Sequence, residues 1–498
     1  MKAEIDELKQ QNTWVLTDLP SNKNTLKGKW VYKYKTNEDN KIIKYKARWV
    51  IKGYDQRLGI DYIETFSTMC RPETLKIIIL NAVMRGHKIY QYDVKNAFVH
   101  APIDIEIYVE QPTGFKENNN KVCKLLKALY GLKQSPRLWY KHLKNIFKQL
   151  GFEMFQYDEA VFIHIQYKIQ IVCHVDDMIV TGPNKQNIDN IMNEVGKQLK
   201  IKYIGELTQF LGVEYKIDYI NKTIFAYQTK YTNNIKNRFN KQHLTPVSTP
   251  VELGVQLIKT TEQADAKDIL IYQQEVGSLL YLAIKTRPDI SYAINRCARF
   301  MSNPNKTHFR AFDRIWKYLN HKDIGIYYNC NNHNTLNLLG YSDADWGGDT
   351  ITRRSTSGYT SFINNNLISW NSTLQKTVAL STCEAEYMAM KEAIKEMIYL
   401  NNIIKYINNL YNNNNMIQKP PLIFIDNDSS IKLGENPEFH KRSKHIDIIY
   451  HFTRECVEEK KITLGYIPTR EQLADGFTKG LNITKHKLFL EGIKMKPI

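Results

Sequence analysis

A chain of 498 residues is too long for one hydrophobic core, so we expect two to four domains. Its 43% hydrophobic and 24% charged residues are ordinary for a soluble globular protein, but its formal net charge of +18 is not. Lys and Arg are spread along the chain, which favours a folded surface that meets a polyanion, most simply nucleic acid. Seven cysteines without a C-x-x-C pair argue against structural zinc. With no signal peptide and no membrane-length apolar run, we expect an intracellular protein with no membrane contact.

The first 50 residues predict a helix followed by a basic hairpin. Residues 3–11 are helix-like, and residues 30–50 alternate apolar and polar side chains on both sides of a polar tip. Lys44, Lys46 and Arg48 make this hairpin a positively charged ribbon of the kind that reaches phosphates. A solvated sheet face explains the same lysines equally well.

The next segments predict a buried helix, a strand and an amphipathic helix. Residues 73–86 are apolar and end at a glycine, as helices commonly do. Residues 88–100 read as a strand with Asp93 near its end, where a carboxylate is well placed for a site. A turn with Gly and Pro then leads into a lysine-rich amphipathic helix that ends near residue 151.

The stretch from residue 168 to 182 is the most informative one. Short β-branched runs flank Asp176 and Asp177, which predicts two buried strands with the aspartates at the hairpin turn between them. Two carboxylates in apolar surroundings need a counter-ion, and Mg²⁺ prefers oxygen ligands and substrate phosphates. This pattern indicates half of a metal site for phosphoryl transfer, whereas an isolated Asp-Asp pair would more often be a solvated turn.

A helix near residues 187–199 and a strand at 208–217 complete the first half of the chain. Residues 245–250 have the composition of a linker, and helices are expected at 272–281 and 310–319.

A polar stretch at residues 331–335 marks a second boundary, after which strands and helices are interspersed as in an α/β domain. Ser381 and Glu384 form a capping-box pattern at the start of a long helix. Four carboxylates fall on a strand, this helix, another strand and a short late helix: Asp343, Glu386, Asp426 and Asp475.

Twelve sequence blocks in a fixed order, from about residue 14 to 481, resemble one known family. The blocks are YKARWVIKGYDQ, QYDVKNAFVHAPIDIEIYVEQPTGF, LYGLKQSPRLWY, HVDDMIVTG, IGELTQFLGVEY, VGSLLYLAIKTRPDISYAINRCARFMSNP, GYSDADWGGD, RRSTSGY, STCEAEYMA, IDNDSSI, HKRSKHIDIIYHFTRE and IPTREQLADGFTK. The chain is similar to the reverse transcriptase and ribonuclease H region of the Pol polyprotein of copia-type (pseudovirid) long-terminal-repeat retrotransposons.

The resemblance implies a polymerase site. Asp93, Asp176 and Asp177 match the three catalytic, metal-binding aspartates of the palm, where two Mg²⁺ (or Mn²⁺) ions serve nucleotidyl transfer. The positions that match nucleotide-binding residues are Lys46, Arg48, Phe98, Tyr130, Gly131 and Gln134. The positions that match the primer-contacting hairpin are Phe210, Leu211 and Gly212. For Phe98, packing in the core is the plain alternative to a position under the sugar.

The resemblance also implies a ribonuclease H site, again with two ions per active site. Its catalytic and metal-binding carboxylates match Asp343, Glu386, Asp426 and Asp475. The nearby Asp345, Asp349 and Asp428 are expected to be solvated neighbours. His445 is a candidate catalytic histidine, for which helix packing is an equal alternative.

The expected fold is a multidomain α+β and α/β protein, with a right hand of fingers, palm and thumb, a helical connection and a ribonuclease H-like domain. The expected domains are a reverse transcriptase at 1–240, a mostly helical thumb and connection at 241–335, and a ribonuclease H-like domain at 336–498. The implied partners are an RNA template, a DNA or RNA primer, RNA–DNA hybrid and dNTPs, with other Pol or Gag-derived proteins as further candidates. The implied location is cytoplasmic, in virus-like particles, with the nucleus as an alternative.

Some residues depart from the family pattern. His174 stands where a tyrosine usually precedes x-Asp-Asp, and protease, integrase and zinc-knuckle motifs are absent. We therefore expect a fragment, truncated copy or processed product of a polyprotein. The alternatives to a two-activity enzyme are a catalytically silent or domesticated nucleic-acid-binding remnant, and a nuclease with an inactive polymerase.

Overall fold

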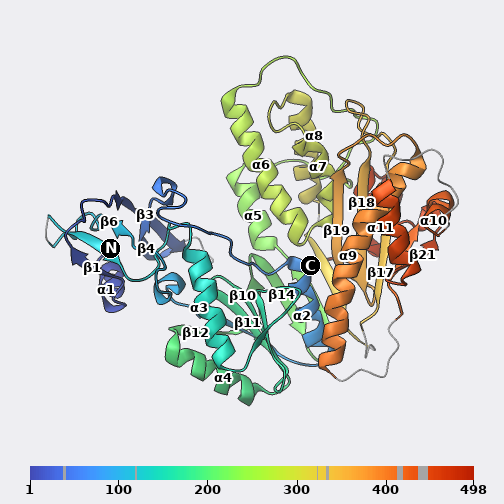
Figure 1. Cartoon of the computed structure of the whole chain (residues 1–498). Coiled ribbons are helices and arrows are strands. Elements are labelled where there is room, and N and C mark those ends of the chain that lie inside the picture. Colours follow the sequence, from blue (N-terminus) through green and yellow to red (C-terminus); the bar gives the residue numbers. More distant parts are fainter. Residues whose placement is uncertain (37–40, 118–119, 322, 332–335, 412–418, 436–446) are drawn as a thin grey trace. The chain divides into compact units, whose positions relative to one another are not determined.

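The structure, a computed structural model, describes the chain except for residues 37–40, 118–119, 322, 332–335, 412–418 and 436–446 (Figure 1). The chain forms two compact units. Unit 1 comprises Met1–Arg71 and Lys88–Glu206, and unit 2 comprises Pro72–His87 and Leu207–Ile498. Within the described parts of the chain, no helix has the length and apolar character needed to cross a membrane.

Unit 1 is built on a six-stranded antiparallel sheet with the order β12-β5-β11-β10-β9-β8. Its strands are β5 (Ile89–Val94), β8 (Glu153–Met154), β9 (Val161–His164), β10 (Ile169–His174), β11 (Asp177–Thr181) and β12 (Ile201–Glu206). The helices α3 (Ser135–Gln149) and α4 (Lys185–Gln198) share one hydrophobic core with it. The expected pair of strands around Asp176 and Asp177 is confirmed.

Alternation along the strands decides which face of this sheet carries polar side chains. Met178 and Val180 are buried in the core with α3 and α4, and burial of each stabilises the fold by about 1.5–3 kcal/mol. Successive residues of a strand point to opposite faces, so Asp177 points away from these helices. Tyr92 and Val94 of β5 lie in the same core, which places Asp93 on the face that Asp177 occupies.

The rest of unit 1 comprises two smaller sheets and a helix. A four-stranded sheet has the order β1-β7-β6-β2, and β3 pairs with β4 as a two-stranded hairpin. The elements are α1 (Lys2–Gln10), β1 (Trp14–Thr17), β2 (Thr25–Leu26), β3 (Gly28–Thr36), β4 (Ile42–Ile51), η1 (Gly53–Asp55), η2 (Ala97–His100), β6 (Tyr108–Val109) and β7 (Val122–Leu125). The predicted basic hairpin is confirmed by the β3–β4 pairing.

Unit 2 contains a five-stranded sheet with the order β13-β14-β15-β16-β22 and a helical core. The strands are β13 (Gln209–Phe210), β14 (Val213–Asp218), β15 (Thr223–Tyr227), β16 (Ile324–Asn329) and β22 (Met495–Pro497). The helical elements are α2 (Pro72–Met84), α5 (Thr229–Arg238), α6 (Ala266–Lys285), η3 (Pro288–Ile290), α7 (Ser291–Ala298) and α8 (Lys306–Leu319). The strand expected at 208–217 is instead a hairpin, because β13 turns back on β14.

A second five-stranded sheet of unit 2 has the order β19-β18-β17-β20-β21, with β20 parallel to both β17 and β21. The long helix α9 lies along this sheet and shares a core with it (Figure 1). The elements are β17 (Leu338–Ala344), β18 (Thr356–Ile363), β19 (Asn366–Leu374), α9 (Thr382–Leu410), β20 (Leu422–Ile425), α10 (Asp428–Glu435), α11 (Asp447–Glu458), β21 (Thr463–Tyr466), η5 (Thr469–Glu471), α12 (Asp475–Thr478) and α13 (Ile483–Gly492). The chain therefore has the mixed, multidomain α and β architecture that the sequence predicted.

The expected domain division at residues 240 and 335 stays a prediction. The two compact units divide the chain at other residues than the expected domains do, because α2 and the strands after Leu207 belong to the unit that contains the C-terminal part of the chain.

Candidate active sites

Asp176 and Asp177 lie at the turn of the β10–β11 hairpin, and β5 brings Asp93 beside them. Asp177 is the cross-strand partner of His174 within the hairpin and of Asp93 on its other side. The Val94 N–H donates to Asp176 O at 2.8 Å, which ties the turn to β5. Three aspartates that are distant in sequence therefore meet at one end of the sheet.

Val175 holds this turn in an unusual backbone conformation. Its φ of 58° lies in the left-handed region, which costs a β-branched residue about 1–2 kcal/mol. The Trp139 indole N–H donates to Val175 O at 2.7 Å, and the Val175 side chain packs against the core of the sheet. The Trp139 indole on α3 and the Val94 N–H at the end of β5 thus hold the aspartate turn from two sides.

The electrostatics of this turn favour a bound cation. Partial desolvation, followed by the charges of Asp176 and Asp93, raises the pKa of Asp177 to about 6. The Asp177 side chain still reaches solvent, so an ion has access to it. A set of carboxylate oxygens is the donor chemistry that Mg²⁺ or Mn²⁺ prefers, and the residues present therefore fit the expected metal.

Arg48, Tyr130 and Phe98 form a row of side chains in unit 1. The Arg48 guanidinium carbon lies 4.8 Å from the Tyr130 ring centroid, and the Phe98 ring meets Tyr130 edge-on at 4.8 Å. Burial raises the pKa of Tyr130 to about 12, while Arg48 lowers it and the charge of Asp176 raises it. The charge of Asp176 therefore reaches Tyr130, which lies between Arg48 and Phe98 in this row.

Gly131 is required by close backbone packing. It adopts a φ of 98°, and a Cβ there would lie 2.0 Å from Ile51 O. The Ile51 N–H donates to Tyr130 O at 2.8 Å, so the turn at 130–131 is fastened directly to β4. This fastening sets the position of Arg48, three residues earlier on β4.

Gln134 and Lys46 differ in their availability to a ligand. Gln134 is 1% exposed, and its amide accepts from Gln56 Nε2 at 3.0 Å and donates to Asp61 O at 2.9 Å. It therefore supports a neighbouring loop, and its contact with a nucleotide stays a prediction. Lys46 is half-buried on β4, on the same face of the strand as Arg48.

The primer-contacting candidates belong to unit 2, at the tight turn between β13 and β14. Leu211 and Gly212 have φ values of 48° and 72°, and the Tyr281 hydroxyl donates to Leu211 O at 2.6 Å. The Phe210 side chain is buried, whereas Leu211 and Gly212 are partly exposed at this turn.

The second carboxylate site lies on the β19-β18-β17-β20-β21 sheet. Asp343 of β17, Glu386 of α9 and Asp426 after β20 bring carboxylate oxygens within 4.8 Å of one another. Among the described residues, no other set of three metal-ligating groups has its ligand atoms within 4.8 Å of one another. This holds also for Asp93, Asp176 and Asp177. Asp343 is 2% exposed and Glu386 is 7% exposed, so the cluster is set into the protein.

The carboxylates of this cluster outnumber the cations beside them, of which Lys479 is one. Burial raises the pKa of Asp343 and of Glu386, and the neighbouring acidic groups raise both further. Glu386 Oε2 is buried and has no hydrogen-bond partner among the described residues. An orphaned carboxylate oxygen beside two other carboxylates fits a site for divalent ions.

Asp475 joins this site through Lys479, which no sequence argument had singled out. Lys479 Nζ lies 2.7 Å from Asp475 Oδ1 and 3.9 Å from Asp343 Oδ2. Burial alone would lower the pKa of Lys479, but Asp343 and Asp475 together raise it. The Thr478 hydroxyl also donates to Asp343 Oδ2, so α12 supplies a hydrogen bond and the residue that follows it supplies a cation.

Two features fix α12 and α9 against the sheet. A Cβ on Gly358 of β18 would lie 2.7 Å from Thr478 Cγ2, so α12 packs directly on the backbone of the strand. The predicted helix start is confirmed, since Ser381 Oγ accepts from the Glu384 N–H at 3.1 Å. The Glu384 carboxylate accepts from the Leu380 N–H, one residue before the position that a capping box uses.

The expectation that Asp345 and Asp349 are solvated is wrong. Asp349 Oδ2 lies 3.0 Å from Arg299 Nη1, and Asp345 accepts from the Thr356 N–H. Arg299, which directly follows α7, also donates to Thr356 Oγ1 at 3.1 Å. These groups fasten α7 to the sheet, a contact for which the local sequence gives no signal. Asp428 is exposed as expected, and His445 lies outside the described residues.

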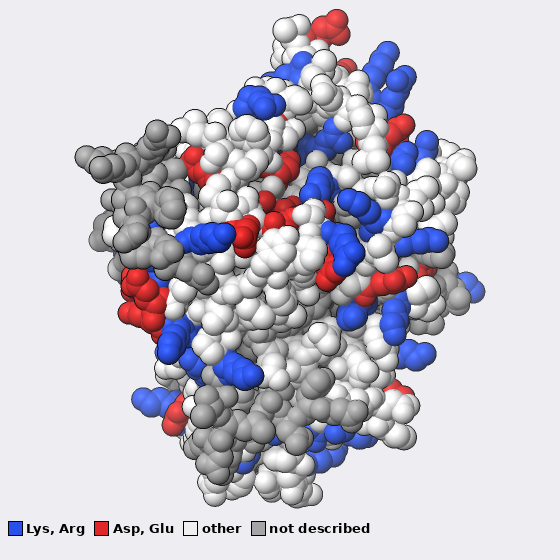
Figure 2. Space-filling view, turned by 90° about the vertical axis from the view of Figure 1, so that its right-hand side faces the viewer, with Lys and Arg blue, Asp and Glu red and all other residues white. Residues whose placement is uncertain are grey.

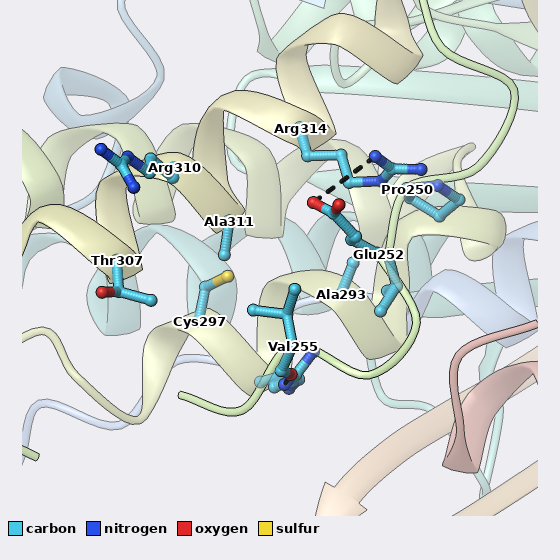
Figure 3. A pocket seen from close by; sticks show the side chains of 11 residues that line it. Pro250, Glu252, Val255, Ala293, Cys297, Thr307, Arg310, Ala311 and Arg314 are labelled. Atoms are coloured by element: carbon cyan, nitrogen blue, oxygen red, sulfur yellow. Dashed lines mark hydrogen bonds and ion pairs between the residues drawn. The ribbon is translucent and has the colours of Figure 1, made fainter. Parts of the chain in front are cut away.

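A pocket of about 210 Å³ lies between α7, α8 and the segment at 250–255 (Figure 3). Arg314 donates to Thr249 Oγ1 at 3.0 Å and lies 3.7 Å from Glu252, while Arg296 donates to Val255 O. These arginines therefore fasten the preceding linker to the helices.

Comparison with known proteins places the chain in a family. Residues 11–253 match the family described as reverse transcriptase (RNA-dependent DNA polymerase). A transposon Ty5-1 protein of Saccharomyces cerevisiae is 31% identical over 314 residues, which cover 61% of this chain and 100% of that protein. The chain belongs to the copia-type retrotransposon Pol family.

The copia-type Pol chain matches only part of its longer relatives. The retrovirus-related Pol polyprotein from transposon TNT 1-94 of Nicotiana tabacum is 36% identical over 505 residues, which cover 99% of this chain and 37% of that polyprotein. A foamy viral protease–reverse transcriptase solved with double-stranded DNA has a TM-score of 0.49 at 14% identity, over 93% of this chain and 68% of that chain.

Proposed function

We propose that this copia-type Pol chain is an RNA-directed DNA polymerase that uses Asp93, Asp176 and Asp177 to hold Mg²⁺ or Mn²⁺. The observation that carries the proposal is the pairing of Asp93 with Asp177 beside Asp176, within a chain whose residues 11–253 match the reverse transcriptase family. The substrates would be a DNA or RNA primer on an RNA template and dNTPs.

Different side chains of this site would bind the metal ions, the triphosphate, and the sugar and base of the incoming nucleotide. Bound divalent ions would supply charge neutralisation and activation of the primer hydroxyl. The planar guanidinium of Arg48 would bind triphosphate oxygens, with Lys46 on the same face of β4. Phe98 and Tyr130 would support the sugar and base of the incoming nucleotide through their ring faces.

A second activity is proposed for unit 2, hydrolysis of the RNA strand of an RNA–DNA hybrid. Asp343, Glu386, Asp426 and Asp475 would hold two ions, and the orphaned Glu386 oxygen supports this assignment. Lysines and arginines are spread around acidic side chains on the face of the molecule drawn in Figure 2, which suits a polyanionic substrate.

Primer extension tests the first activity. The natural chain should extend a DNA primer on an RNA template with Mg²⁺, and Asp176→Asn should reduce the rate by about 10³-fold or more because a metal ligand is removed. Asp428→Asn changes an exposed carboxylate of unit 2 that does not belong to the Asp93 set, and it serves as the control. Extension at the full rate by Asp176→Asn, or without divalent ions, would refute the proposal.

Hybrid cleavage tests the second activity with the same proteins. Asp343→Asn should abolish release of RNA fragments from a labelled RNA–DNA hybrid and leave primer extension intact, and Asp176→Asn should do the reverse. If the natural chain binds the hybrid but performs neither reaction, it is a binding remnant of a Pol protein.

A further inference from the structure

The β3–β4 hairpin has two faces of different chemistry. Its register pairs Tyr32 with Ala47 and Tyr34 with Tyr45, and cross-strand partners share a face. We call the face that carries Tyr32, Tyr34 and Tyr45 the aromatic face. The opposite face carries the side chains of Lys29, Lys33, Lys44, Lys46 and Arg48, and we call it the cationic face.

The aromatic face is buried at one end of the hairpin and open at the other. At the base, Trp49 is 2% exposed and meets Trp30 edge-on at 5.3 Å, and Gly28 leaves room for the Trp49 ring. Towards the tip, Tyr34 is 60% exposed and Tyr45 is 78% exposed. The same row of side chains thus changes from core to exposed aromatic surface.

The cationic face is the one that faces the candidate nucleotide site. Arg48 stacks on Tyr130, and Val50 of the same face lies against Gly131. The exposed tyrosines therefore point away from that site, and the proposed polymerisation mechanism does not use them. Tyr32 is 66% exposed, and its hydroxyl donates to Met1 Sδ at 3.6 Å.

We propose that the aromatic face is a stacking platform for the bases of single-stranded nucleic acid. Exposed aromatic rings beside cations are the features with which proteins bind single strands, because every base offers a ring face and every nucleotide a phosphate. The proposal rests on the proposed polymerase function, whose template is single-stranded ahead of the primer terminus.

The positive charge of the hairpin favours single-stranded nucleic acid over a second copy of the chain as the partner of the aromatic face. Five described cations lie on its cationic face, so a second copy of this hairpin would meet repulsion. Single-stranded RNA or DNA offers bases to the rings and negative charge to lysines that reach around the strand edges.

Binding of a fluorescent single-stranded RNA, without divalent ions or dNTPs, tests the platform. Tyr34→Ala with Tyr45→Ala should weaken binding on the order of tenfold or more, with an unchanged slope of log affinity against log salt concentration. Lys33→Ala with Lys44→Ala should instead make that slope shallower, by about 0.7 for each phosphate that the protein no longer neutralises. Tyr54→Ala, which removes a tyrosine 70% exposed outside the hairpin, should leave binding unchanged.

Two further measurements make the result decisive. Replacement of Tyr34 and Tyr45 by Phe should restore binding, because the ring and not the hydroxyl stacks on the base. If the alanine pair binds RNA like the natural chain, or changes only self-association in light scattering, the platform is refuted.

Primer extension separates this inference from the proposed function. The alanine pair should extend normally on a template that ends at the copied position and poorly on one with a long single-stranded extension. Poor extension on both templates would contradict the platform. If the natural chain extends no primer but binds single-stranded RNA through the tyrosines, the polymerase proposal fails and the platform stands.

Discussion

Val175 combines a β-branched side chain with a left-handed backbone next to two catalytic candidates. Glycine adopts this conformation without cost, whereas alanine retains most of the strain. We therefore expect Val175→Gly to be more stable than Val175→Ala by about 1 kcal/mol, the reverse of the usual order in strands. Urea unfolding of both variants measures the difference, and the usual order would show that the turn is not strained.

The ionisation of Glu386 should make the stability of the protein depend on pH. Its pKa is raised above the ordinary 4.5, first by burial and then by Asp343 and Asp426. The folded state therefore keeps a proton that the unfolded state has released, so the free energy of unfolding without divalent ions should fall as the pH rises above about 4.5.

The variant Glu386→Gln removes this ionisation and tests the linkage. Without divalent ions near pH 8 it should be more stable than the natural chain by about 1–3 kcal/mol, because unfolding of the natural chain is favoured by release of the Glu386 proton and the variant has no such proton to release. Near pH 4 the two proteins should converge. Added Mg²⁺ should stabilise the natural chain more than the variant, and equal metal responses in thermal unfolding would argue against Glu386 as a ligand.

At the scale of elements, Gly358 sets the distance between β18 and α12. A Cβ there would meet Thr478 at 2.7 Å and Phe477 Cβ at 2.9 Å, so α12 must shift in Gly358→Ala. Because α12 carries Asp475 and is followed by Lys479, we expect lower stability by about 1–3 kcal/mol and much slower hybrid cleavage, with primer extension retained. Gly277→Ala on α6 is the control, since nothing lies within 4 Å of its Cβ and the helix should gain about 1 kcal/mol. Equal cleavage by both variants would refute this role of Gly358.

Local elements were predictable where one stretch of sequence carries the whole signal. Alternation predicted the β3–β4 hairpin, short β-branched runs predicted the strands around Asp176, and Ser381 predicted the start of α9. Their partners were not predictable in this way. The pairing of β5 with β11 depends on residues that are distant in sequence. The end of a buried strand marked Asp93 as a site candidate, but only the family resemblance grouped it with Asp176 and Asp177.

The interactions that the sequence did not predict are ion pairs and turns that depend on the tertiary fold. Lys479 lies near Asp343 only because α12 packs on β18, and Asp349 meets Arg299 only because α7 packs on the same sheet. At Leu211 the residues themselves predicted a continuous strand, since Leu gives no sign of a positive φ, and only the family resemblance indicated a hairpin there.

At the scale of the whole molecule, α2 joins parts of the chain that the expected domains keep apart. The Thr74 hydroxyl lies 2.8 Å from the Tyr399 hydroxyl of α9, and Lys76 Nζ donates to Ile368 O of β19 at 2.8 Å. Lys76 Nζ also lies 3.7 Å from the centroid of the Trp370 ring. A helix near the start of the chain is thus packed against the β17–β19 sheet and α9.

A chain that ends at residue 240 should therefore be a poor independent domain. It keeps α2 but lacks β19 and α9, so apolar and polar groups of α2 that are buried in the full chain become exposed. We expect faster proteolysis within residues 72–87, stronger binding of a hydrophobic dye and a lower unfolding temperature than in the full chain. Lys76→Met in the full chain is the matched control, because it removes the hydrogen bond to β19 but keeps the helix covered. If the shortened chain resists proteolysis at α2 as well as the full chain does, the reverse transcriptase region folds by itself and the packing of α2 on β19 and α9 is dispensable.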